Sequence, residues 1–164
     1  MLDMRIMKVL ISSAMLVAPA DFASAQSATR SENGGAAPLV HDGGVCAGLS
    51  WIRLLPAEHV RVEDGPDFMV LRFEGPQGLE WGVYSGNHAQ VRGNGPLLLR
   101  RDGVIIHRAF EGGEFRGYLA EKGSWQNHFF GTVFTGADRD RVFFDRVDFS
   151  ARGQSLCARR TGSP

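Results

Sequence analysis

The stretch "LLLRRDGVIIHR", residues 97–108, carries the clearest structural signal in the chain. Two runs rich in leucine, isoleucine and valine flank the dipeptide Asp102-Gly103. Glycine adopts positive φ without a Cβ clash, and aspartate tolerates it. A dipeptide of this kind between two β-favouring runs predicts a hairpin with a two-residue turn.

The turn also sets the expected register of the hairpin, because residues equally distant from a two-residue turn face each other. Leu98 and His107 should share one face of the sheet, and the other two pairs should share the opposite face. The expected cross-strand pairs, in order away from the turn, are Leu99–Ile106, Leu98–His107 and Leu97–Arg108.

Similar short apolar or alternating runs follow one another from Cys46 onward, with Gly, Pro, Asp and Asn between them. No segment shows a sustained helical period, and one short helical turn is expected ahead of Pro56. The other segments predicted as strands are 59–63, 67–74, 79–85, 89–92, 115–122, 128–135, 141–151 and 155–159.

Strands at intervals of roughly 8–12 residues with turn signals between them are typical of antiparallel sandwiches and barrels. The sequence therefore predicts an all-β domain, a single antiparallel β-sandwich of jelly-roll type. A lipocalin-like β-barrel is the alternative. The stretch "VFFDRVDF", residues 142–149, resembles the closing strand of jelly-roll carbohydrate-binding modules, and it implies no functional residue.

The N-terminal residues 1–25 read as a signal peptide. Arg5 and Lys8 precede an apolar core, and an A-x-A cleavage site ends at Ala25. The apolar core is shorter than the about 20 residues of a transmembrane helix. We expect export to the periplasm or the extracellular space, with no membrane span in the mature chain.

The rest of the chain divides into a flexible leader at 26–44, one folded domain at 45–160 and a disordered tail at 161–164. Two cysteines, Cys46 and Cys157, bracket nearly the whole folded part. In an oxidising compartment such a pair is expected to form a disulfide.

Several function classes lack support in the composition. The formal net charge is zero, so nothing favours binding of nucleic acid. Nucleophile, phosphate-loop and dinucleotide motifs are absent, and we expect no cofactor. The histidines lack the close spacing of common metal sites, and we expect no metal. In the folded part they are His59, His88, His107 and His128.

Two sets of aromatic, amide and imidazole side chains are the candidate ligand-binding residues, because aromatic faces stack on flat ligands while amides and imidazoles bond to hydroxyls. Trp81 and Tyr84 differ by three positions, so a regular strand sends them to opposite faces. In the second set, Asn127 is expected at a loop margin, and either Phe129 or Phe130 in the core. The candidates are Trp81, Tyr84, Asn87, His88, Trp125, Asn127 and His128.

These observations favour a non-enzymatic binding protein whose ligand is a glycan, a small molecule or an exported protein. A small hydrolase acting on envelope or extracellular polymer through acidic residues is one alternative. Asp145 and Asp148 sit among aromatics, yet their odd spacing sends them to opposite faces of a strand. A structural or inhibitory partner of another exported protein is the other alternative.

Overall fold

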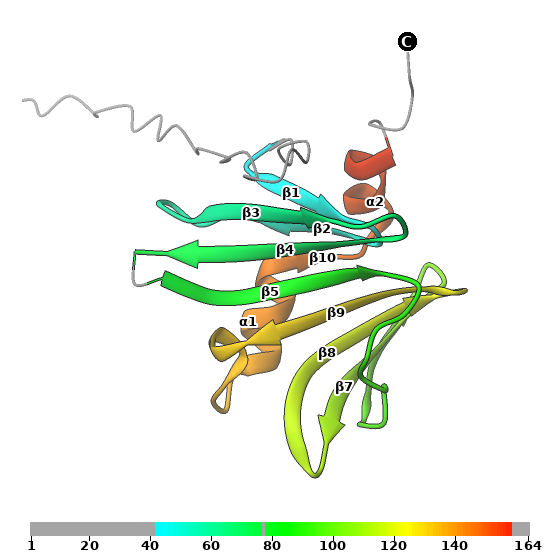
Figure 1. Ribbon diagram of the computed structural model, residues 1–164. Helices are drawn as coiled ribbons and strands as arrows, with labels where there is room; N and C mark the ends of the chain where they lie inside the picture. Colours follow the sequence, from blue (N-terminus) through cyan, green and yellow to red (C-terminus); the bar gives the residue numbers. More distant parts are fainter. Residues whose placement is uncertain (1–41, 77, 159–164) are drawn as a thin grey trace, which may run out of the picture.

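The computed structural model describes residues 42–76 and 78–158, which form two antiparallel sheets and two short helices (Figure 1). The larger sheet contains β3 (His59–Asp64), β4 (Phe68–Gly75), β5 (Gly78–Gly86), β6 (Leu97–Arg101), β7 (Val104–Glu111), β8 (Glu114–Lys122) and β9 (Trp125–Gly131). The smaller sheet contains β1 (Gly44–Ala47), β2 (Ser50–Arg53) and β10 (Val147–Asp148). The two α-helices are α1 (Arg139–Arg146) and α2 (Ala151–Ala158), and one turn of 3-10 helix, η1 (Thr132–Phe134), precedes them.

The two sheets pack as layers, which confirms the predicted all-β, sandwich-like fold. The larger sheet has the order β3-β4-β5-β9-β8-β7-β6, and the smaller has the order β1-β2-β10. In Figure 1, β2, β10 and α1 are drawn behind the strands of the larger sheet. Within the described residues β3 and β6 each pair on one side only, so the larger sheet is open. The alternative of a lipocalin-like closed barrel is therefore wrong.

The β6–β7 hairpin has the predicted turn but only part of the predicted register. Asp102 and Gly103 both have positive φ, 52° and 79°, as a two-residue hairpin turn requires. Leu99 faces Ile106 as expected, but Leu97 faces His107. The pairs Leu98–His107 and Leu97–Arg108 are wrong, because a β-bulge between Leu97 and Leu99 inserts one extra residue into β6.

The last third of the chain contains helices where strands were predicted. Residues 141–146 of the strand expected at 141–151 belong to α1, in which Phe143 and Arg146 are buried three positions apart on one side. The run of aromatic and β-branched residues had favoured a strand. Only Val147–Asp148 remain extended, as β10. The resemblance of 142–149 to a closing jelly-roll strand therefore does not hold.

Four further segments differ from their predictions. The strand expected at 128–135 ends at Gly131, and residues 132–134 form η1 instead. Residues 155–159 were expected as a strand, but α2 begins after Ser150, whose Oγ accepts a hydrogen bond from the Gly153 N–H (3.3 Å) in the manner of an N-cap. The turn expected ahead of Pro56 is absent, since residues 50–53 form β2. Residues 89–92 form no strand.

Residues 87–96, the crossover loop, run across the outer face of the larger sheet. They connect β5 to β6, and the strands β9, β8 and β7 lie between these two in the sheet. The Ala89 N–H donates to Gln126 Oε1 (3.0 Å), and the Asn94 side chain forms two hydrogen bonds with the Phe110 backbone (2.9 and 3.0 Å). The loop is thereby attached to β9 and to β7.

The inner face of the larger sheet carries an aromatic core. Phe73 and Trp81 stack at 3.9 Å between ring centroids, and Tyr118 stacks on Phe143 of α1 at 4.0 Å. Phe129 meets Phe143 edge to face at 5.1 Å. All five side chains are at most 1% exposed, so α1 and the smaller sheet exclude water from this face.

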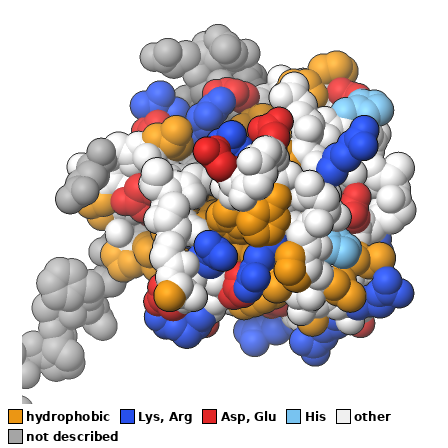
Figure 2. All heavy atoms as spheres, turned by 90° about the horizontal axis from the view of Figure 1, so that it is seen from below, with side chains coloured by type: hydrophobic (Ala, Val, Ile, Leu, Met, Phe, Trp, Pro, Cys, Tyr) orange, Lys and Arg blue, Asp and Glu red, His pale blue; other side chains and the backbone are white. Residues whose placement is uncertain are grey.

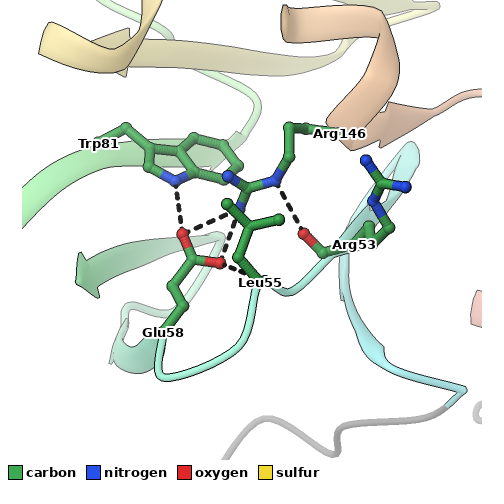
Figure 3. A network of polar contacts seen from close by, with 5 residues as sticks. All are labelled: Arg53, Leu55, Glu58, Trp81 and Arg146. Carbon is green, nitrogen blue, oxygen red and sulfur yellow. Dashed lines mark hydrogen bonds and ion pairs between the residues drawn. The ribbon is translucent and has the colours of Figure 1, made fainter. Parts of the chain in front are cut away.

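A buried ion pair joins the two layers (Figure 3). Arg146 Nη2 donates to both carboxylate oxygens of Glu58, at 2.9 and 2.7 Å. Trp81 Nε1 and the Leu55 N–H also donate to this carboxylate, each at 3.0 Å, and Arg146 Nε donates to the Arg53 carbonyl at 3.0 Å. Buried charges are tolerated when partners satisfy them in this way.

The predicted disulfide between Cys46 and Cys157 is confirmed. It connects β1 to α2, with the two Cα atoms 5.5 Å apart and the two residues 111 positions apart in the chain. The described residues contain no free cysteine. The bond therefore attaches the last helix to the first strand of the smaller sheet.

The terminal segments lie mostly outside the described residues. Three terminal segments stay predictions, as do the boundaries of the folded domain. They are the signal peptide at 1–25, the part of the 26–44 leader that ends at residue 41, and the tail at 161–164. Gly44, the last residue of the expected leader, begins β1. Within the described part of the chain, no helix is long and apolar enough to cross a membrane.

Candidate functional site

The structure separates the seven predicted ligand-binding residues according to the face of the sheet. Trp81 and Asn127 point to the inner face and are 1% and 0% exposed. Trp125 lies on the same face and is half-buried. Tyr84 and His128 pair across β5 and β9 on the outer face. The opposite orientation of Trp81 and Tyr84, predicted from their spacing, is confirmed.

The inner-face residues form a structural network. Asn127 Nδ2 donates to the Ala47 carbonyl (2.6 Å) and to Ser50 Oγ (3.1 Å). Its Oδ1 accepts from Ser85 Oγ (2.8 Å), which in turn accepts from Trp125 Nε1 (3.0 Å). Asn127 is buried inside β9, so the expected loop margin is wrong. This network attaches the β1–β2 turn to the larger sheet, and burial keeps Asn127 out of reach of a ligand.

The outer face carries a groove of about 740 Å³ between the larger sheet and the crossover loop. Its floor is formed by Phe68, Val70 and Arg72 of β4, Tyr84 of β5, and His128 and Phe130 of β9. Its wall is formed by His88, Gln90 and Val91 of the crossover loop, with Asp67 ahead of β4. The groove thus brings together three of the predicted residues, Tyr84, His88 and His128. Asn87 is exposed next to His88 and does not line it.

Two glycines of β5 create the hollow in the floor. Gly82 lies between Arg72 and Phe130 in the register, and Gly86 lies four positions further along β5. A Cβ on Gly82 would come within 2.7 Å of the Phe130 ring. A Cβ on Gly86 would come within 2.7 Å of Tyr84 Oη. The rings therefore lie against bare backbone, an arrangement that glycine alone permits.

The aromatic rings of the floor are held in place by their neighbours. Phe68 and Tyr84 stack with 5.8 Å between centroids and 20° between planes. Tyr84 Oη accepts a hydrogen bond from the His88 N–H (3.1 Å), which attaches the crossover loop to the floor. His128 and Phe130 lie 5.3 Å apart. The floor is therefore ordered before any ligand arrives.

His128 is the titratable group at the centre of the floor. Its Nε2 lies 2.9 Å from the Arg116 carbonyl of β8. Burial lowers the pKa of His128 below the ordinary value, and the hydrogen bond to this carbonyl opposes that change only in part. The imidazole is accordingly neutral at neutral pH.

The charged groups of the groove are largely balanced. Arg72 Nε donates to Glu63 Oε1 (2.7 Å) on the neighbouring strand β3. This hydrogen bond lowers the pKa of Glu63 and raises that of Arg72, so both stay charged. Asp67 is the single carboxylate among the residues that line the groove. The groove therefore has no strong field of one sign.

The two acidic residues considered for hydrolysis, Asp145 and Asp148, form local contacts away from the groove. Asp145 lies on α1 and pairs with Arg141 (3.5 Å), one helical turn away. Asp148 Oδ1 accepts a hydrogen bond from the Ser150 N–H (2.7 Å) ahead of α2. Neither residue lines the groove.

A second polar cluster, formed by Arg108, Tyr118 and Asp140, attaches α1 to β7 and β8. Arg108 and Tyr118 both donate to Asp140, the latter at 2.8 Å. Burial, followed by the hydrogen bond to Asp140, raises the pKa of Tyr118. The hydrogen bonds from Arg108 lower the pKa of Asp140. Each polar group of the cluster has a partner within the cluster, and these contacts hold α1 against the larger sheet.

Sequence reasoning missed the contribution of β4 to the groove. Phe68, Val70 and Arg72 alternate along this strand and so reach the same face as Tyr84. A signal for the groove was nevertheless present in the sequence. The outward positions of β5 read Gly, Tyr, Gly, and the two glycines leave backbone without side chains beside bulky residues on the neighbouring strands. Pairing of β4, β5 and β9 could not be deduced from local patterns, because β9 lies some forty residues further along the chain.

The residues that line the groove offer apolar ring faces, hydrogen-bonding groups, one carboxylate and one guanidinium. Among the residues that the structure describes, no group of His, Cys, Asp and Glu side chains is placed to hold a metal ion. Figure 2 shows, on one face of the molecule, basic and acidic side chains interspersed around hydrophobic ones, in keeping with the net charge of zero. Comparison with protein-family models, curated proteins and solved structures gives no match, so the geometry of the groove carries the functional argument.

Proposed function

We propose that this chain is a non-enzymatic binding protein whose outer-face groove takes a neutral ligand with a flat apolar face and hydrogen-bonding groups. A carbohydrate is the first candidate, and another small molecule of the same character is the second. The binding would take place in the periplasm or outside the cell, a location that the Cys46–Cys157 disulfide supports.

The observation that carries this proposal is the set of aromatic rings lying on the glycine backbone of β5. Phe68, Tyr84 and Phe130 provide apolar surface, while His128 and Gln90 provide hydrogen-bonding groups beside it. Small-ligand sites are generally concave and mostly apolar, with a few polar groups that set orientation. Rings that are already ordered also reduce the entropy lost on binding.

The alternatives find less support in the same groove. A glycosidase of the usual kind needs two carboxyl groups across the scissile bond. Among the described residues that line the groove, only Asp67 carries one. A structural or inhibitory protein partner would be expected to use a flat or projecting surface, whereas this site is hollowed.

A calorimetric titration with matched variants tests the proposal. The probes are the neutral hexasaccharides of cellulose, xylan, mannan and β-1,3-glucan. Phe68 of the groove and Phe144 of α1 are 37% and 39% exposed, so Phe68→Ala and Phe144→Ala remove equally accessible rings from different places. Loss of a stacking partner weakens binding by about 1–3 kcal/mol, or roughly 5- to 150-fold in Kd.

We expect at least one probe to bind, Phe68→Ala to weaken that binding within this range, and Phe144→Ala to leave it unchanged. Absence of binding to all four probes at millimolar concentration would contradict the carbohydrate proposal. Equal effects of the two variants would show that the groove is not where the probe binds.

A further inference from the structure

The side chain of His128 determines which hydrogen-bonding group a ligand needs in order to bind in the groove. The inference that follows rests on the binding function proposed above. We propose that His128 contacts the ligand through Nδ1 as a hydrogen-bond acceptor. The groove then selects ligands that offer a hydroxyl or N–H donor beside an apolar ring face.

The first argument is the position of His128 in the sheet. In the register it lies between Tyr84 of β5 and Leu119 of β8. The crossover loop covers the outer face on the β8 side: Leu119 is 1% exposed and lies beside Gly93 of the loop. On the β5 side the floor is open to the groove. A ligand in the groove therefore reaches His128 from the side of Tyr84.

The second argument is the orientation of the imidazole. Nε2 is directed at the Arg116 carbonyl on β8, at 2.9 Å. The two ring nitrogens of histidine point in diverging directions, so Nδ1 points away from Arg116 and hence away from β8. Among the described residues, no hydrogen bond to Nδ1 is formed. The free edge of the ring is consequently the edge nearer the open part of the groove.

The third argument is the tautomer. A carbonyl oxygen can only accept, so the proton of the neutral imidazole has to reside on Nε2. Nδ1 then carries a lone pair and acts as an acceptor. Burial keeps the ring neutral at neutral pH by lowering its pKa. The protein backbone thus determines that the ligand is offered an acceptor at this position.

The charged and titratable groups around His128 come from three strands and two loops, and both arginines among them are paired with carboxylates. Arg116 pairs with Glu111 and Glu114, and Arg72 pairs with Glu63. The groups facing the ring or the groove are Tyr84 of β5, Arg116 of β8, His88 of the crossover loop, Arg72 of β4 and Asp67 ahead of β4.

The proposed contact predicts that acidification weakens ligand binding. Protonation of His128 converts Nδ1 from an acceptor into a donor, which faces the ligand donor and repels it. Affinity should therefore be constant above the ordinary histidine pKa of 6.5 and should fall at lower pH, because the pKa of His128 is lowered.

The test uses two substitutions at His128 and one control, with the neutral hexasaccharide that binds the wild-type full chain. Gln places a donor near Nε2 and removes the acceptor at Nδ1, whereas Asn places a carbonyl oxygen near Nδ1. We expect His128→Gln to weaken binding about threefold to tenfold at pH 7.5, the effect of one neutral hydrogen bond. His128→Asn should recover part of the loss. His59→Gln, on β3 outside the groove, should bind as the wild type does.

The outcomes separate this inference from the proposed function. If Phe68→Ala weakens binding but His128→Gln binds as the wild type does, with the same pH profile, the role of His128 is wrong and the binding groove stands. If none of the four hexasaccharides binds the wild type, the carbohydrate-binding function fails and this inference fails with it. A weaker His128→Gln variant, whose affinity no longer responds to acid, supports the inference.

A ligand-free measurement closes the test. Nitrogen-15 NMR of the full chain reports which imidazole nitrogen carries the proton. The proposal requires the Nε2–H tautomer for His128 at pH 7.5, and a titration midpoint below 6.5. Observation of the Nδ1–H tautomer would overturn the proposal whatever ligand binds.

Discussion

The two faces of the larger sheet contain similar residues and differ in what covers them. Phe129 and Phe130 are neighbours in β9, yet Phe129 is 0% exposed in the core and Phe130 lines the open groove. The inner face is covered by α1 and the smaller sheet. Among the residues that the structure describes, those that cover the outer face belong to the crossover loop and lie on the β7–β8 side. Aromatic content alone therefore does not distinguish a core from a candidate binding site.

The same contrast holds for two pairs of arginine and glutamate. Arg146 and Glu58, behind the inner face, have side chains that are 5% and 3% exposed. Arg72 and Glu63, at the outer face, have side chains that are 36% and 54% exposed. The distances are alike, 2.7 Å in both. Only the inner pair is withdrawn from water, so its removal should affect stability far more.

The largest effect is expected from the two phenylalanines of β9. Phe129→Ala leaves a cavity in the aromatic core and should lower the free energy of unfolding by about 3–5 kcal/mol. Phe130→Ala removes a partly solvated ring and should lower it by less than half as much. Urea denaturation of the two variants measures the difference. Equal losses would mean that the outer face is as tightly packed as the core.

Loss of the inner ion pair should likewise lower the free energy of unfolding more than loss of the outer pair. Arg146→Ala leaves the Glu58 carboxylate buried without its cation, which should cost about 3–5 kcal/mol. Arg72→Ala breaks an exposed pair and should cost about 1 kcal/mol or less. Denaturation at low and at high salt provides a further check, because only the Arg72 pair should weaken when salt screens it. A mild effect of Arg146→Ala would indicate that water enters the inner layer.

The disulfide belongs to the inner layer and should affect stability without affecting the groove. Cys157→Ser opens a loop of 111 residues, for which the expected loss is about 2–5 kcal/mol. The melting temperature, measured by circular dichroism, should fall by several degrees. Hexasaccharide binding at a temperature where the variant is folded should match the wild type. Weakened binding there would show that the two faces are coupled.

The smallest effect concerns the pH dependence of stability. Because the pKa of His128 is lowered on folding, the unfolded chain takes up the proton first as the pH falls below 6.5. The contribution of His128 is thus complete above pH 6.5 and is lost as the pH falls through the lowered pKa. His128→Gln should reduce the slope of the free energy of unfolding between about pH 6.5 and 5. An unchanged slope would contradict the assigned environment of His128.

Local sequence predicted several features because their causes are local. The Asp102-Gly103 turn needs only two residues that tolerate positive φ. The opposite orientation of Trp81 and Tyr84 needs only the two-residue period of a strand. The same period predicted that one of Phe129 and Phe130 is core. The cysteine pair could be predicted because no other partner was available to either residue.

Other features could not be predicted from local sequence, because tertiary contacts overrode local preference. The run of aromatic residues at 142–149 has β-forming character, yet Phe143 completes the core only from a helix that places Arg146 on the same side, against Glu58. The bulge between Leu97 and Leu99 shifts the pairing of β6 with β7 by one residue. Neither effect is visible in a short window of sequence.

The sequence by itself determined that side chains alternate along each strand and that the aromatic ones therefore divide between two faces. That alternation is a property of the extended backbone. Tertiary structure alone decided which face became the core. The smaller sheet, α1 and the disulfide join distant parts of the chain over one face, and the crossover loop leaves part of the other open. Tyr84 and His128 line a groove, and Trp81 and Asn127 do not, because burial depends on what packs against a residue from far along the chain.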